Sequence, residues 1–178
     1  MKAVIDTNVL LVANEQHDGA SPDCVIKCVQ QLLKLQKSGV AVIDDEYRIL
    51  SEYQKKARSK RSNRVGDKFL KWLLQSQYSS RVEQVALSET ALDCFAEFPD
   101  PHLEPRFDPP DRKFAAVANA HPDHPPIWQA VDSKWLDWWG ALKARGIEVV
   151  FLCPDDICGF YTKKFPGRPV PVLPESVT

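Results

Sequence analysis

Apolar residues occur along the chain in two patterns, short unbroken runs and stripes that repeat every three to four positions. The runs predict buried strands, and the stripes predict helices. The predicted strands are 2–6, 40–43, 127–131 and 147–152. The predicted helices are one from Ser21 to Ser38, one capped by Asp44 or Asp45 that carries Ile49 to Tyr53, one from Asp67 to Gln77, a short one starting at Ser88, one from Lys134 to Arg145, and a short one after Pro154. Strands that alternate with helices indicate an α/β fold with a largely parallel sheet.

The chain is long enough for one hydrophobic core and too short for two independent domains. It has 178 residues, of which 44% are hydrophobic, and chains of this size form one sizeable core. A proline-rich stretch from Phe98 to Pro110 predicts a loop, and the prolines after about residue 166 predict a tail. We therefore expect residues 1–178 to form a single domain that ends in a proline-rich tail.

Charge and cysteine content narrow the class of protein. The 23 Lys and Arg residues nearly balance the 24 Asp and Glu residues, so any contact with nucleic acid must be local. No apolar run reaches the roughly 20 residues that span a bilayer, and the N-terminus does not resemble a signal peptide. The five cysteines are odd in number and lack C-x-x-C spacing. A soluble, cytoplasmic protein with reduced, buried thiols and no membrane contact is the simplest interpretation.

Two acidic residues lie at the ends of predicted strands. Asp6 ends the first strand, and Asp132 follows the strand at 127–131. Parallel strands present their carboxyl ends at the same edge of a sheet, where open α/β sheets bind their ligands. If the two strands are neighbours, both carboxylates lie close enough to share a cation.

Two further acids also have simpler alternative roles. Asp111 follows Asp108 and two prolines at a helix start. This pattern suits a capping box in which Asp108 is the N-cap, Pro109 is the first helical residue, and Asp111 is the acid that reaches back to the N-cap. Glu52 lies near the apolar side of its helix, where a glutamate is commonly solvated or paired. Considered individually, neither residue identifies a site.

Four carboxylates gathered at one sheet edge would need a cation. Their repulsion raises their pKa values unless positive charge neutralises it, and hard divalent ions such as Mg²⁺ prefer oxygen ligands of this kind. Such an ion activates water and stabilises charge on a phosphate during in-line displacement, without a covalent nucleophile. Acids in this arrangement therefore suit hydrolysis of phosphodiester bonds.

Four segments of the chain resemble, in order and rough spacing, the acidic motifs of the PIN-domain family. They are Val4–Leu11, Ile49–Tyr53, Asp111–Ala118 and Ala130–Trp135. The resemblance covers about residues 2 to 152. It implies a three-layer sandwich with a central, largely parallel sheet flanked by helices, and a metal-dependent nuclease, which in many members of the family is a ribonuclease.

The resemblance also implies roles for individual residues. Thr7 or Asn8 is expected to help hold the first carboxylate or the attacking water. The expected substrate is single-stranded or structured RNA, and an antitoxin-like protein partner and a homo-oligomer are both compatible with the family. The residues implied as catalytic ligands of Mg²⁺ or Mn²⁺ are Asp6, Glu52, Asp111 and Asp132.

Two departures from the family pattern keep other functions open. Lys134 stands where a further acid often follows in the last motif, which favours an alternative in which the fold is a non-catalytic module for nucleic-acid binding or assembly. Insertions around residues 55–80 and 97–110 make the chain longer than the compact toxin members, which weakens the toxin hypothesis specifically. DNA also fits as a substrate, because hydrolysis at the phosphate requires no 2′-hydroxyl.

A basic run directly follows Glu52. Its charged residues are Lys55, Lys56, Arg58, Lys60, Arg61 and Arg64. Because clustered lysines and arginines contact phosphates, one hypothesis makes this run a substrate-binding surface beside the metal site. A solvated helix end explains the run equally well.

Overall fold

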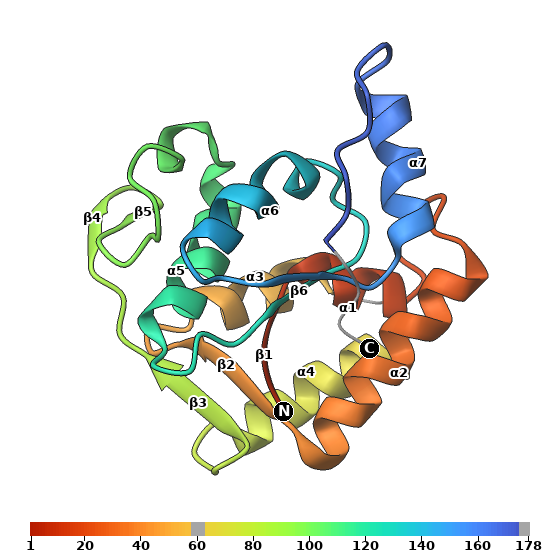
Figure 1. The fold of residues 1–178 in the computed structure, drawn as a ribbon. Coiled ribbons are helices and arrows are strands. Elements are labelled where there is room, and N and C mark those ends of the chain that lie inside the picture. The colour runs from red at the N-terminus through yellow and green to blue at the C-terminus, as the bar shows by residue number, and fades with distance from the viewer. Residues whose placement is uncertain (58–62, 175–178) are drawn as a thin grey trace.

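The fold is built around a parallel β-sheet with helices on both of its faces (Figure 1). The computed structural model describes residues 1–57 and 63–174. The central sheet has the strand order β3-β2-β1-β6-β7, and every neighbouring pair is parallel. Its strands are β1 (Lys2–Ile5), β2 (Val40–Asp44), β3 (Val82–Val85), β6 (Ile127–Gln129) and β7 (Val149–Phe151).

Helices cover the sheet in two layers. Helices α1, α2 and α4 pack against one another. Helix α5 packs on the strands β1, β2 and β6. The helices are α1 (Thr7–Ala13), α2 (Pro22–Ser38), α3 (Arg48–Lys56), α4 (Val65–Ser76), α5 (Arg112–Ala120), α6 (Trp135–Ala144) and α7 (Pro154–Lys164). The predicted α/β sandwich with a parallel central sheet is confirmed. Among the described residues, no helix is long and apolar enough to cross a bilayer.

Burial of the central strands explains why their sequences are unbroken apolar runs. Ala3, Val4 and Ile5 of β1 are at most 2% exposed, because helices cover both faces of a parallel sheet. The strands predicted near residues 2, 40, 127 and 147 are all present. The edge strand β3 was not among the predictions, since its sequence Val-Glu-Gln-Val has only two apolar residues.

The prediction of a short helix that starts at Ser88 is wrong. Residues 89–95 instead form a small antiparallel hairpin, in which β4 (Glu89–Ala91) pairs with β5 (Cys94–Phe95). Tertiary contacts stabilise the hairpin: Arg48 of α3 forms an ion pair with Glu89 at 3.0 Å, and the guanidinium of Arg112 donates to the carbonyl of Asp93. Local propensity is weak enough for such contacts to override it.

The proline-rich segment 98–110 packs onto α6 and delivers the chain to Asp111. It contains two short 3₁₀ turns, Glu104–Arg106 and Pro109–Asp111. The ring of Phe107 stacks on Trp138, with a distance of 4.0 Å between the centroids, and is fully buried. Aromatic packing therefore fixes a segment that has little regular structure of its own.

Two hydrogen-bonding groups place α3 next to the end of β1. The buried carboxylate of Asp44 accepts hydrogen bonds from the backbone N–H groups of Arg48 at 2.7 Å and Ile49 at 2.9 Å. The hydroxyl of Tyr53 donates to the carbonyl oxygen of Ile5. Asp44 therefore caps the helix, as its position predicted, and these contacts fix the helix that carries Glu52.

Replacing Asp44 with alanine is expected to lower the free energy of unfolding by about 2 kcal/mol, because it leaves two helix N–H groups without an acceptor. Urea unfolding monitored by circular dichroism measures this loss. The neighbouring exposed acid provides the control, since Asp45→Ala removes the same side chain from the surface. Equal midpoints for the two variants would contradict the capping role.

Candidate metal centre

Asp6 and Asp132 lie at the same edge of the sheet, as expected from their positions after strands. β1 and β6 are parallel neighbours, and the backbone N–H of Asp6 donates to the carbonyl of Trp128 at 3.0 Å. The side chain of Asp6 is buried and caps α1 by accepting from the N–H of Asn8 at 2.9 Å. Asp132 lies in the turn between β6 and α6, where its carboxylate accepts from the N–H of Lys134 at 3.1 Å.

Glu52 reaches this edge from α3 and is already surrounded by donors. Its carboxylate accepts from the hydroxyl of Thr7 at 2.7 Å and from the ammonium groups of Lys56 at 2.8 Å and Lys113 at 2.5 Å. Burial raises the pKa of Glu52, but the two lysines and Thr7 outweigh it and leave the pKa lower than usual. Glu52 is therefore charged, and its charge is locally neutralised.

Asp111 lies at the start of α5, and neither its side chain nor that of Asp108 makes a capping hydrogen bond. The alternative role in a capping box is therefore wrong. Burial raises the pKa of Asp111 to about 7, with further contributions from the charges of Asp132, Asp108 and Glu52, while Lys113 opposes them. Poor solvation and the neighbouring negative charges both favour the protonated, uncharged form of this carboxyl group.

The carboxylates interact as one group. Burial raises the pKa of Asp6 well above its usual value, and the charges of Asp111, Asp132 and Glu52 raise it further. Asp132 has a cation nearby, because the ammonium group of Lys164 lies 3.9 Å from one of its carboxylate oxygens. Among the described residues, neither Asp6 nor Asp111 forms an ion pair with a lysine, arginine or histidine. The fold thus places the four predicted acids near enough for their charges to affect one another's pKa values, and it gives Asp6 and Asp111 no cationic partner among the described residues.

This donor set fits a hard divalent cation. Asp6, Glu52, Asp111 and Asp132 supply carboxylate oxygens, the type of ligand that Mg²⁺ and Mn²⁺ prefer. Among the described residues, no three of these side chains have oxygens as close together as the sulfur atoms of Cys24, Cys28 and Cys153, which lie within 4.8 Å of one another. A bound ion would therefore be held by one or two of the carboxylates and by water, as Mg²⁺ commonly is. An added double positive charge would relieve the repulsion that raises the pKa values of Asp6 and Asp111.

Thr7 and Asn8 support the site differently from the expectation. The Thr7 hydroxyl donates to Glu52, and Asn8 contacts Asp6 through its backbone N–H. The side chain of Asn8 instead donates to the buried Gln129 and accepts from the N–H of Ala130 at 2.9 Å. Asn8 therefore joins the end of β1 to the end of β6, which fixes the relative positions of the two strand-end acids.

The structure describes three of the six charged residues of the basic run. Lys56 is paired with Glu52, Arg64 forms an ion pair with Glu15, and Lys55 is exposed. The remaining predicted residues, Arg58, Lys60 and Arg61, lie outside the described residues. A role for this run in binding substrate stays a prediction.

Lys113 is the main residue of the site that the motifs did not identify. It is buried at the start of α5, where its ammonium group contacts Glu52 and the carbonyl oxygen of Pro110. The signal in the sequence is a lysine beside the apolar run 114–118, because a buried lysine requires a partner. Lys134, in contrast, pairs with Asp108 at the margin of the site.

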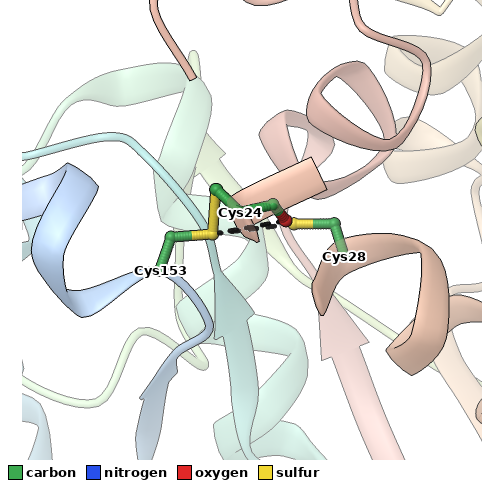
Figure 2. Close-up of side chains that lie close together, drawn as sticks. All are labelled: Cys24, Cys28 and Cys153. Carbon is green, nitrogen blue, oxygen red and sulfur yellow. Dashed lines mark hydrogen bonds between the residues drawn. A yellow bond between two sulfur atoms is a disulfide. The ribbon is translucent and has the colours of Figure 1, made fainter. Parts of the chain in front are cut away.

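The cysteines depart from the expectation of five reduced thiols. A disulfide joins Cys24 of α2 to Cys153, the residue before α7, and Cys28 lies one helical turn along with its sulfur 3.9 Å from that of Cys153 (Figure 2). Burial raises the pKa of the Cys28 thiol to about 12, with a smaller effect of the Asp156 charge. The pairing spans 129 residues, so only the fold reveals it. Thiolates suit soft metals, which distinguishes this group from the carboxylate centre.

Reducing the disulfide is expected to lower the free energy of unfolding by about 2–5 kcal/mol, because the bridge restricts a long loop in the unfolded chain. Urea unfolding with and without dithiothreitol measures the change, and Cys153→Ser should reproduce it. Cys158→Ser, which changes an unpaired cysteine of α7, is the control. Finding five reactive thiols in the denatured but unreduced protein would contradict the disulfide.

Comparisons with known proteins add no relative to this picture: no protein-family model matches the chain, and no curated protein or solved structure is significantly similar to it. The PIN-domain resemblance stays a prediction that depends on the four motifs. Function must therefore be argued from the carboxylates themselves.

Proposed function

We propose that this protein is a divalent-metal-dependent nuclease that hydrolyses phosphodiester bonds, with RNA as its substrate. The observation that carries the proposal is that the charges of Asp111, Asp132 and Glu52 raise the pKa of Asp6, which is buried and has no cationic partner among the described residues. The choice of RNA depends on the PIN-domain resemblance alone.

One or two of Asp6, Asp111 and Asp132 would hold the cation together with water, and Glu52 completes the acidic set. When bound, Mg²⁺ or Mn²⁺ supplies Lewis acidity toward a phosphate oxygen and lowers the pKa of a bound water. Lys113 keeps Glu52 charged and fixes its orientation. Asn8 and the Asp6 cap hold the strand-end acids in place, so that little reorganisation is needed when substrate binds.

A second candidate function is a non-catalytic module that binds nucleic acid. One observation favours it: Glu52 is fully supplied with donors by Thr7, Lys56 and Lys113, so this acid does not need a metal. RNA binding that persists in EDTA without any cleavage in Mg²⁺ or Mn²⁺ would support this alternative.

A cytoplasmic site of action is part of the proposal. This part of the proposal requires Cys24 and Cys153 to be reduced in the cell, because thiols in that compartment are mostly kept reduced. The test counts free thiols in protein taken rapidly from cells under acid quench. Five free thiols would support the cytoplasmic site, and three would contradict it.

The direct test is cleavage of labelled single-stranded RNA and DNA by the purified protein in Mn²⁺, Mg²⁺ or EDTA. We expect RNA to be cut in either metal and to stay intact in EDTA. Cleavage that is equally fast in EDTA would exclude the metal mechanism, and folded protein that cuts neither polymer in either metal would exclude a nuclease that acts alone.

A further inference from the structure

A cavity opens beside the carboxylates on the side of α7. It has a volume of about 520 Å³, within the range of roughly 300–1,000 Å³ that is typical of small-molecule sites. Four segments line it, namely the start of α1, the α1–α2 loop, the β6–α6 turn and α7. The side chains used below are His17, Asp132, Ser133, Phe160, Lys163 and Lys164. Because Asp132 belongs to both, the cavity and the carboxylate centre are continuous.

Two lysines place positive charge at this cavity. Lys163 and Lys164 lie in the last turn of α7 and are exposed. The ammonium group of Lys164 lies 3.9 Å from a carboxylate oxygen of Asp132, too far for a close hydrogen bond. It can therefore turn to an incoming anion at small cost, because an exposed ion pair of this kind contributes little to stability. The lysines give the cavity an affinity for phosphate that the carboxylates lack.

Aromatic rings supply a second type of contact. Phe160 of α7 is half-buried, and its ring meets that of His17 edge-on, with 5.3 Å between the centroids. The ammonium group of Lys163 lies 5.9 Å from the Phe160 ring centre. A flat apolar ring beside a cation is the combination that binds a nucleotide, since the ring stacks on the base and the cation contacts the phosphate.

We propose that this cavity binds one unpaired nucleotide of the substrate, next to the scissile phosphate, with Phe160 against its base and Lys163 and Lys164 against its phosphate. The inference rests on the proposed nuclease function and deepens it by naming the substrate as single-stranded. A base can enter the cavity only if it is free of a duplex, because a paired base is stacked between its neighbours.

The test measures binding without cleavage. Asp6→Asn protein in EDTA is titrated with a fluorescent single-stranded RNA over a range of salt concentrations. In this background, Lys163→Gln with Lys164→Gln should weaken affinity about tenfold. The slope of log affinity against log salt concentration should become shallower by about 0.7, the contribution of one neutralised phosphate on a single strand. Phe160→Leu, which keeps an apolar side chain, should weaken affinity about fivefold or more and leave the salt dependence unchanged.

The matched control changes two exposed lysines at the far end of α2, as Lys34→Gln with Lys37→Gln. It alters net charge by the same amount as the α7 double variant. Equal losses in the two double variants would overturn the proposal, because the effect would then be general electrostatic attraction. Equal affinity for a duplex of the same sequence would overturn the preference for single strands.

The same variants separate this inference from the proposed function. Lost binding in the α7 variants of a protein that never cuts RNA would support the cavity and reject the nuclease. Metal-dependent cleavage with the same KM in the α7 double variant as in the α2 control would support the nuclease and reject the cavity.

Discussion

Replacing Asp6 with asparagine is expected to reduce metal-dependent cleavage by at least about 100-fold, because even residues that only support metal ligands cost about 10–100-fold when changed. The fold should survive. Asparagine retains an oxygen that can accept from the N–H of Asn8, and it removes a buried charge whose pKa is raised by burial and by three neighbouring carboxylates. In the absence of metal the variant should therefore be at least as stable as the natural protein.

The account requires this variant to lose cleavage activity without losing stability. Cleavage rates in Mn²⁺ and urea midpoints in EDTA measure them on the same protein preparation. The exposed acid after β2 provides the control, and Asp45→Asn should alter neither quantity appreciably. Full activity in Asp6→Asn would remove Asp6 from the centre, whereas a large loss of stability would mean that its charge serves the fold.

The metal-free protein is expected to lose stability as pH rises from about 4 to about 7. The pKa of Asp111 is raised from 3.8 to about 7, and that of Asp6 is raised as well. In this window the folded state binds more protons than the unfolded state, so the free energy of unfolding falls with increasing pH. Glu52 acts at the other end: its lowered pKa makes its contribution disappear as pH falls through and below 4.5. A maximum near pH 4 follows.

Added Mg²⁺ should restore the stability that the metal-free protein has lost above pH 7, because the ion binds the deprotonated carboxylates and stabilises only the folded state. Thermal unfolding in EDTA and in excess Mg²⁺, from pH 4 to pH 8, measures both effects. We expect the rise in Tm on adding metal to be several degrees at pH 8 and near zero at pH 5, at roughly 2–4 °C per kcal/mol. Asp111→Asn should flatten the curve in EDTA. A metal effect that is equal at both pH values would contradict this linkage.

The sequence predicts the strand-end acids because their placement follows from local rules. An apolar run that stops at Asp6 is a buried strand with an acid at its carboxyl end, and the same argument applies to Asp132. Once β1 and β6 are parallel neighbours, the two residues must share an edge. The positions of Glu52 and Asp111 followed only from the resemblance, since each is carried by a helix whose docking depends on distant contacts.

Other features depend on contacts between distant segments, whose partners the sequence does not identify. Three contacts join parts of the chain that are far apart in sequence. They are the Cys24–Cys153 disulfide, the ion pair between Lys113 and Glu52, and the ion pair between Arg48 and Glu89 of the hairpin. The hairpin shows this most clearly, because its Ser-Glu-Thr-Ala sequence suits a helix start while its ion pair with Arg48 stabilises a strand. Long-range packing decides such segments, and a single sequence does not display it.

The most direct test of the carboxylate centre is a Mn²⁺ titration followed by electron paramagnetic resonance at pH 8, where the signal of free Mn²⁺ is lost on binding. The natural protein should remove Mn²⁺ from solution in a saturable way that Mg²⁺ competes with, and the double variant Asp6→Asn with Asp132→Asn should not. If the folded natural protein binds no more Mn²⁺ than that variant, the four acids do not form a metal centre and the proposed nuclease mechanism is wrong.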